Sequence, residues 1–224
     1  MSALLFGSIS TVADTSELQR EAFNEAFAQH GLDWQWDHDD YVEMLGSNGG
    51  QDRVAAYAEA RGEEVDAAAV HATKSEVFQA KLRGGAVEPR DGVVETIAAA
   101  REAGYRVALV TTTSPANIAA LGDALRPHLD LDDFDLVVDT EQVEQVKPDK
   151  AAYVHALDRL GETAGDCVAV EDNNGGVLAA AAAGIACVAF PNANTAGFDF
   201  DEAVGRVQAL DFSELAGHTG PAAA

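Results

Sequence analysis

Basic residues are scarce in this chain. It carries 14 Lys and Arg against 38 Asp and Glu over 224 residues, a formal net charge of −24. Such a field repels nucleic acid and anionic membranes, so neither is expected as a partner. Only four basic residues are lysine: Lys74, Lys81, Lys147 and Lys150. This composition suits a salt-rich cytoplasm, where screening weakens self-repulsion; the alternative is an acidic protein without salt adaptation, from a GC-rich genome.

Long apolar runs and cysteine pairs are also missing. No run approaches the roughly 20 apolar residues of a membrane span, and the start Met-Ser-Ala-Leu lacks a basic secretory leader, so we expect a cytoplasmic protein. Two cysteines, Cys167 and Cys187, make no disulfide framework in a chain of this size. Both fall in apolar strand-like runs, so we expect them to serve packing.

Apolar strand-like runs alternate with helical patterns along most of the chain. Since 47% of the residues are hydrophobic, the chain can bury a good core. The alternation predicts a parallel sheet with helices on both faces, and a ligand site beyond the carboxyl ends of its strands. The expected strands are about residues 3–6, 105–111, 135–139, 166–171 and 185–190.

The alternation is broken between about residues 15 and 85. Ser16 and Gln19 have the spacing of a capping box at the start of a helix. Further helices are expected around residues 39–45, 50–61, 66–72 and 74–83. The segment therefore predicts an inserted helical unit, and its glycines at 84 and 85 supply backbone freedom for a hinge.

Four short segments lie where polar groups can meet. Residues 7–11, Gly-Ser-Ile-Ser-Thr, follow the first strand, and Thr111 and Thr112 follow the second. Lys147 precedes a proline, and the acidic pair Glu171-Asp172 ends the fourth strand. Because parallel strands end at one edge of a sheet, these four segments are expected to converge there.

These segments, in this order and spacing, resemble the motifs of the haloacid dehalogenase-like (HAD) superfamily, specifically the CbbY-like and β-phosphoglucomutase-like phosphatases. The resemblance covers essentially the whole chain. It implies an α/β fold with a Rossmann-like core, a parallel five-stranded sheet in the order 3-2-1-4-5, and an inserted all-helical cap. The implied domains are the core, residues 1–14 and 86–224, and the cap, residues 15–85.

The first motif departs from the family pattern, Asp-x-Asp-Gly-Thr. In the family the first aspartate attacks phosphorus and the second moves a proton. Here Gly7 and Ile9 stand at those positions, so no catalytic residue of this motif is intact. Ser10 also replaces the flexible glycine of this motif, which restricts the backbone conformations that the loop can adopt.

The other motifs carry over residue by residue. The resemblance implies that Thr111, Thr112 and Lys147 bind phosphoryl oxygens. It implies a weakened Mg²⁺ site at Glu171, Asp172 and the backbone carbonyl of Ile9, with one carboxylate lost. The alternative for Lys147 is a buried structural ion pair with one of the two acidic residues.

Three further residues are candidates near the cleft. Asp14 is a replacement catalytic acid, or it caps a helix or lines the entrance. Arg53 ends a loop, residues 46–53, that resembles the family's substrate-selecting loop, so it binds a second phosphate or sugar hydroxyls, or else forms surface ion pairs. Lys74 is a similar substrate contact, or a plain solvated lysine. Gln51 stands where close relatives often have lysine, which lowers the expected affinity for a bisphosphate.

Three functional hypotheses remain open. The first is a catalytically impaired HAD hydrolase homologue that binds phosphate or a small phosphorylated metabolite; no protein partner is identified. The second is a Mg²⁺-dependent phosphatase of small sugar phosphates, in which a metal-bound water attacks directly. The third is a structural or interaction protein with an empty cleft.

Overall fold

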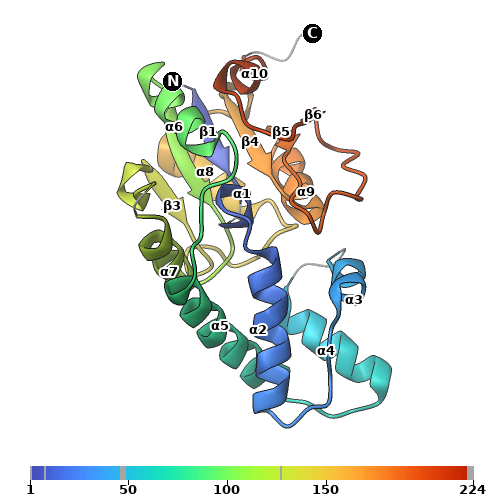
Figure 1. Cartoon of the computed structure of the whole chain (residues 1–224). Coiled ribbons are helices and arrows are strands. Elements are labelled where there is room, and N and C mark those ends of the chain that lie inside the picture. The colour runs from blue at the N-terminus through green and yellow to red at the C-terminus, as the bar shows by residue number, and fades with distance from the viewer. Residues whose placement is uncertain (1, 8, 46–48, 127, 221–224) are drawn as a thin grey trace.

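The core of the molecule is a six-stranded parallel sheet in the order β3-β2-β1-β4-β5-β6 (Figure 1). The computed structural model describes residues 2–7, 9–45, 49–126 and 128–220. The strands are β1 Ala3–Phe6, β2 Arg106–Val110, β3 Leu136–Val138, β4 Cys167–Glu171, β5 Ala186–Ala189 and β6 Gly205–Arg206. The predicted order 3-2-1-4-5 is confirmed, but the count of five is wrong: β6 adds an edge. It has two residues, too few to leave an alternating pattern in the sequence.

Both faces of the sheet are covered by helices. In β1, Leu4 and Phe6 point into one apolar cluster, while Ala3 and Leu5 point into another. All four are buried, as expected for a parallel strand between two layers. The first cluster takes residues from α6 (Val93–Glu102), α7 (Pro115–Leu125) and α10 (Phe212–Ala216), and the second takes them from α8 (Ala151–Leu160) and α9 (Asn174–Ala182).

The two cysteines lie within this packing, as predicted. Cys167 in β4 and Cys187 in β5 are buried and form no disulfide. Burial raises the pKa of the Cys167 thiol to about 12, so it stays protonated at neutral pH. Both side chains therefore act as small apolar groups between sheet and helices.

Four helices stand apart from the sheet at the opposite end from the chain termini (Figure 1). They are α2 Ser16–Gln29, α3 His38–Met44, α4 Gly50–Arg61 and α5 Ala67–Gly84. They enclose a cluster of their own, in which Phe27 and Trp36 meet edge to face with ring centroids 4.6 Å apart. We call this group, residues 15–85, the cap. None of the helices in the described part of the chain has the length and apolar character that crossing a bilayer requires.

The helix α5 is longer than expected. The sequence predicted two helices, residues 66–72 and 74–83, whereas one helix runs through both. Its buried side chains Val70, Lys74 and Phe78 recur every four residues, so a single continuous stripe is buried, and α5 packs on α2 and α7. The β-branched Thr73 lowers helix propensity only slightly and does not interrupt this stripe.

The predicted capping box at Ser16 and Gln19 is wrong. The residue before α2 is Thr15, which makes no side-chain cap, and the Ser16 hydroxyl donates to Asp14 Oδ1 at 2.6 Å. The amide of Gln19 instead accepts a hydrogen bond from Lys74 Nζ at 3.0 Å. Gln19 thus links α2 to α5 rather than closing the first turn of α2.

Candidate active site

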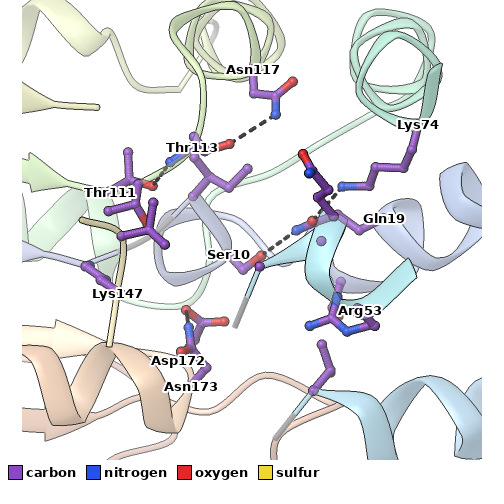
Figure 2. Close-up of a pocket in the computed structure, with 18 of the residues that line it drawn as sticks. Ser10, Gln19, Arg53, Lys74, Thr111, Thr113, Asn117, Lys147, Asp172 and Asn173 are labelled. Carbon is purple, nitrogen blue, oxygen red and sulfur yellow. Dashed lines mark hydrogen bonds between the residues drawn. The ribbon is translucent and has the colours of Figure 1, made fainter. Parts of the chain in front are cut away.

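A cleft of about 550 Å³ lies between the carboxyl edge of the sheet and the cap (Figure 2). Most of the predicted site residues line it. We call its sheet side the core wall, made of Gly7, Ile9, Thr111, Thr112, Thr113, Lys147, Asp172, Asn173 and Asn192. We call its helical side the cap wall, made of Gln19, Phe23, Tyr41, Asp52, Arg53, His71 and Lys74.

Glu171 lies beneath the core wall and is fully buried. Its carboxylate sits between two glycines: a Cβ added to Gly7 would fall 2.0 Å from the Glu171 carboxyl carbon, and a Cβ added to Gly176 would do the same. Atoms cannot approach so closely. The carboxylate therefore fills the space beside Gly7 that any side chain at this position would need.

Lys147 is held from beneath the same wall. Its Nζ donates to the Val110 carbonyl and to Glu171 Oε1, each at 2.6 Å, and also to the Gly7 carbonyl. An ammonium group has three N–H donors, so these three acceptors use all of them. Lys147 would have to give up one of these partners to donate to a phosphate. The ion pair with Glu171 is one of the two that the sequence offered as the alternative to phosphate binding.

The electrostatics of Glu171 follow from its burial. Desolvation raises the pKa of its carboxyl group above the usual range, and the neighbouring Lys147 opposes the rise. Tyr153 adds a hydrogen bond from its hydroxyl to Oε1 at 2.8 Å, and burial raises the pKa of Tyr153 well above 10. The second oxygen, Oε2, is buried without a partner in the described part of the chain.

The residues expected to hold Mg²⁺ make other contacts in the described structure. Asp172 already accepts hydrogen bonds from Thr11 on Oδ1 and from Asn192 on Oδ2, each at 3.0 Å. The Ile9 carbonyl accepts the Ala13 amide at 3.0 Å in the short helix α1, Ile9–Val12. Among the described residues, no three acidic, histidine or cysteine side chains are grouped to hold a metal ion. Mg²⁺ demands a near-octahedral set of oxygens, and the Lys147 ammonium pairs with Glu171, one of the two remaining carboxylates.

The end of β2 supplies neutral hydrogen-bonding groups. Thr111 accepts the Thr113 amide at 3.2 Å, and the Thr113 hydroxyl accepts from Asn117 at 3.0 Å (Figure 2). Ser114 caps α7, so the positive end of this helix lies just behind the threonines. Thr112 lies on the same wall. This part of the core wall therefore presents hydroxyl and amide groups together with the N-terminal end of a helix.

On the cap wall, the neighbours of Lys74 in the described part of the chain are an amide and two aromatic rings. Lys74 Nζ donates to the Gln19 amide oxygen and lies 4.8 Å from the ring centre of Phe23 and 5.0 Å from that of Phe78. Burial, with the neighbouring Arg53 adding to the effect, lowers the pKa of Lys74 to about 7. Lys74 is thus buried, not solvated.

Arg53 and His71 flank Lys74 on the cap wall. Arg53 donates to the Met44 carbonyl at 3.1 Å, and its guanidinium carbon lies 5.6 Å from the Tyr41 ring centre. Burial lowers the pKa of His71 to about 4, with Lys74 and Arg53 adding to the effect, so this imidazole is neutral at pH 7. Of the predicted loop 46–53, residues 46–48 lie outside the described residues.

Asp14 lies away from the cleft. It lines a smaller neighbouring pocket beside Arg90 and accepts the Ser16 amide and hydroxyl. The structure therefore does not bring it to the core wall. Several residues at the site were missed from the sequence, among them Gln19, His71 and Tyr153. His71 and Lys74 stand three apart in one helix, a spacing that could have indicated a shared face.

Comparison with known proteins gives consistent matches over nearly the whole chain. A family model described as a haloacid dehalogenase-like hydrolase matches residues 1–184. Protein CbbY from a plasmid of Cupriavidus necator is 40% identical over 217 residues, covering 91% of this chain and 84% of the relative. Protein CbbY of Cereibacter sphaeroides is 38% identical, covering 97% of this chain and 95% of the relative.

Solved structures agree with these matches. The crystal structure of CbbY from Rhodobacter sphaeroides in complex with phosphate has a TM-score of 0.85 at 36% identity and covers 96% of each chain. A mutant of the same protein in complex with xylulose-(1,5)bisphosphate has a TM-score of 0.87 at 36% identity, covering 98% of this chain and 99% of that one.

Proposed function

The chain belongs to the haloacid dehalogenase-like hydrolase family, and on that premise we propose that it binds a small phosphorylated sugar with little or no turnover. The family's phosphoryl transfer needs a carboxylate at each of two positions after β1. Gly7 and Ile9 supply neither. The cleft and its polar lining remain, so the chain still binds the ligand although it has lost the groups for phosphoryl transfer.

One observation carries this proposal. The Glu171 carboxylate fills the space beside Gly7, and it is paired with Lys147 and Tyr153 instead of facing the cleft. A carboxylate that is fully buried and absent from the cleft lining is badly placed to attack phosphorus. Loss of a nucleophile in an unrelated hydrolase costs about 10⁶ in turnover, which sets the scale expected here.

The cleft fits a ligand of this class. Its volume of about 550 Å³ is in the usual range for small-molecule sites, and its lining combines hydroxyls, amides and three buried basic side chains, Arg53, Lys74 and Lys147. The related CbbY structures contain phosphate and xylulose-(1,5)bisphosphate, which makes phosphorylated sugars the first probes to try. The division into a core, residues 1–14 and 86–224, and a cap, residues 15–85, is part of the same proposal.

Titration calorimetry with a set of sugar phosphates tests the proposal, with the ³¹P spectrum of each sample recorded afterwards. We expect heat of binding and an intact phosphate ester. Binding followed by rapid appearance of inorganic phosphate would favour the metal-water phosphatase instead. Absence of binding to every sugar phosphate would favour a structural role with an empty cleft.

A further inference from the structure

We propose that Gln79 and Asn117 are positioning residues for the ligand site. They orient the Thr113 hydroxyl so that its O–H donates to an oxygen of a sugar phosphate bound at the ends of β1 and β2. This inference rests on the proposed function. It gives helix α5 of the cap an influence on the ligand that passes through two side-chain amides and needs no contact between Gln79 and the ligand.

A chain of hydrogen bonds joins α5 to the end of β2. Gln79 Nε2 in α5 donates to Asn117 Oδ1 in α7 at 3.0 Å, and Asn117 Nδ2 donates to Thr113 Oγ1 at 3.0 Å (Figure 2). Asn117 and Thr113 both line the cleft, and Asn117 is buried. Gln79 is not part of the cleft lining as described, so it acts through Asn117.

The direction of this chain is set by the two amides. A carboxamide carries its oxygen and its NH₂ group on opposite sides, so Asn117 offers NH₂ to Thr113 while its oxygen accepts from Gln79. A hydroxyl has one hydrogen, and a Thr113 oxygen that accepts from Asn117 leaves this hydrogen to donate elsewhere. Among the described residues none accepts it. The hydrogen is therefore available to a ligand oxygen, and the donors along such a chain strengthen one another.

The backbone of Thr113 is fixed on both sides. Its N–H donates to Thr111 Oγ1 at 3.2 Å, and its carbonyl accepts the Thr140 N–H at 3.0 Å. Rotation of the side chain is the freedom that is left, and the hydrogen bond from Asn117 restricts it. The orientation of the hydroxyl is thus decided by the Asn117 amide rather than by the loop.

Helix α5 holds Gln79 beside α7 because α5 belongs to two apolar clusters. Val70, near its start, packs in the cluster of the cap, whereas Val77, Phe78 and Leu82 join a cluster that covers the sheet. The helix also packs directly on α7. Gln79 lies in the half of α5 that is anchored to the sheet layer, so the Asn117 amide has its partner before any ligand arrives. A donor that is already oriented binds with less loss of entropy.

Replacing Gln79 tests the direction of the chain. Glutamate has the shape of glutamine but only accepts, so Gln79→Glu attracts the Asn117 NH₂ group and turns Asn117 Oδ1 toward Thr113. The Thr113 hydrogen then donates to Asn117 instead of the ligand. Calorimetry with ribose 5-phosphate, or with the sugar phosphate that binds most tightly, should show an affinity about tenfold weaker, the loss of one hydrogen bond to a charged group.

A neutral variant gives the contrast that a structural role would not produce. Gln79→Met leaves the Asn117 amide without a preferred direction, so about half of the molecules keep the productive one and the affinity should fall about twofold. A purely structural role predicts the opposite ranking, because Gln79→Glu still forms a hydrogen bond to Asn117 and Gln79→Met does not.

A double-mutant cycle separates the direction of the hydrogen bonds from the added charge. Thr113→Val removes the hydroxyl and should itself weaken binding about tenfold. In that background Gln79→Glu should cost less than about a further twofold, because no hydroxyl is left to redirect. Ala80→Glu adds the same charge at the next, exposed position of α5 and should leave binding within about twofold of the unmodified chain.

A second variant keeps the test valid if Gln79→Glu fails to fold. Asn117 lies in the first turn of α7, where an acidic side chain suits the helix dipole, so Asn117→Asp is compatible with the helix. The two oxygens of the new carboxylate would accept from both Gln79 and Thr113, so the Thr113 hydrogen is again withdrawn from the ligand. The affinity should again fall about tenfold, and the fall should be absent in the Thr113→Val background.

The outcomes separate this inference from the proposed function. If the unmodified chain binds a sugar phosphate and Gln79→Glu binds it as tightly, the positioning role is overturned while sugar-phosphate binding stands. A loss on Gln79→Glu that is equally large in the Thr113→Val background, or a larger loss on Gln79→Met, overturns it in the same way. If the unmodified chain binds neither ribose 5-phosphate nor any other sugar phosphate tried, the proposed function is overturned and this inference with it.

Discussion

The two walls of the cleft bury their cations in opposite ways. On the core wall, Lys147 is neutralised by Glu171 and saturated by two backbone carbonyls. On the cap wall, Lys74 is held by an amide and two aromatic rings. A cation with a built-in counter-ion supports the fold, whereas one with neutral partners still attracts an anion. The same residue type is therefore neutralised within the fold on one wall and left with uncharged described partners on the other.

The largest effect should come from breaking the core-wall pair. Lys147→Met leaves the Glu171 carboxylate buried beside Tyr153 without a counter-ion, so the free energy of unfolding should fall by about 3–5 kcal/mol. Denaturant unfolding measures this loss. Adding Glu171→Gln to the same chain should restore most of it, because the uncompensated charge is gone. A loss below about 1 kcal/mol would show that the pair is not buried as described.

The space beside Gly7 gives the next largest effect. Gly7→Ala places a methyl group against the Glu171 carboxylate, which Gly176 confines from the other side. The free energy of unfolding should therefore fall by about 1–3 kcal/mol. Gly84→Ala is the matched control, because nothing lies within 4 Å of the added methyl. The penalty at Gly7 should largely disappear in a Glu171→Ala background. An equal penalty in both backgrounds would assign the strain to another contact.

On the cap wall, pH should control affinity. Burial lowers the pKa of Lys74 to about 7, so its ammonium is present below that pH and lost above it. A phosphate ester is already a dianion there, so affinity for a sugar monophosphate should fall roughly fivefold between about pH 7 and about pH 8. Calorimetry at several pH values measures the change. A Lys74→Arg variant that binds should lack this dependence; the same dependence in that variant would place the titration elsewhere.

Salt should have the smallest effect on the free energy of unfolding. It should distinguish the repulsion among surface carboxylates, which salt screens, from the buried Lys147–Glu171 pair, which it does not. With a formal charge of −24, self-repulsion weakens as salt shortens the Debye length from about 10 Å at 0.1 M to about 3 Å at 1 M. The unfolding free energy of the whole chain should rise by about 1 kcal/mol in KCl over this range. The loss caused by Lys147→Met should stay constant, since buried pairs are screened little. If that loss vanished at high salt, the pair would be solvent-exposed.

Much of the fold was predictable because its signals are local. Apolar runs located five strands, and the order 3-2-1-4-5 that the family resemblance implied is the observed one, with β6 added at the edge. What failed depended on packing: α5 is one helix because Val70, Lys74 and Phe78 share a buried face. The two-residue strand β6 is too short to leave a pattern.

The sequence predicted which residues lie at the candidate site, but not which hydrogen bonds and ion pairs they form. Motif positions brought Thr111, Lys147 and Asp172 to one edge, as expected. Which acceptors Lys147 takes depends on the side-chain direction of Glu171 and on Tyr153, which lies in α8, and neither is visible in residue spacing. The hydrogen bond between Lys74 and Gln19 joins α5 to α2 across 55 positions of sequence, and no residue spacing indicated it.

The rate of phosphate release by the unmodified chain tests most directly whether Glu171 and Gly7 have removed the family's chemistry. Sugar phosphates are incubated with Mg²⁺ at high salt, and the Asp172→Ala variant is run in parallel. The unmodified chain should release phosphate no faster than the Asp172→Ala variant. Fast, Mg²⁺-dependent release that disappears on Asp172→Ala would contradict this account, because an attacking group and a metal would then both operate at a wall that should hold neither.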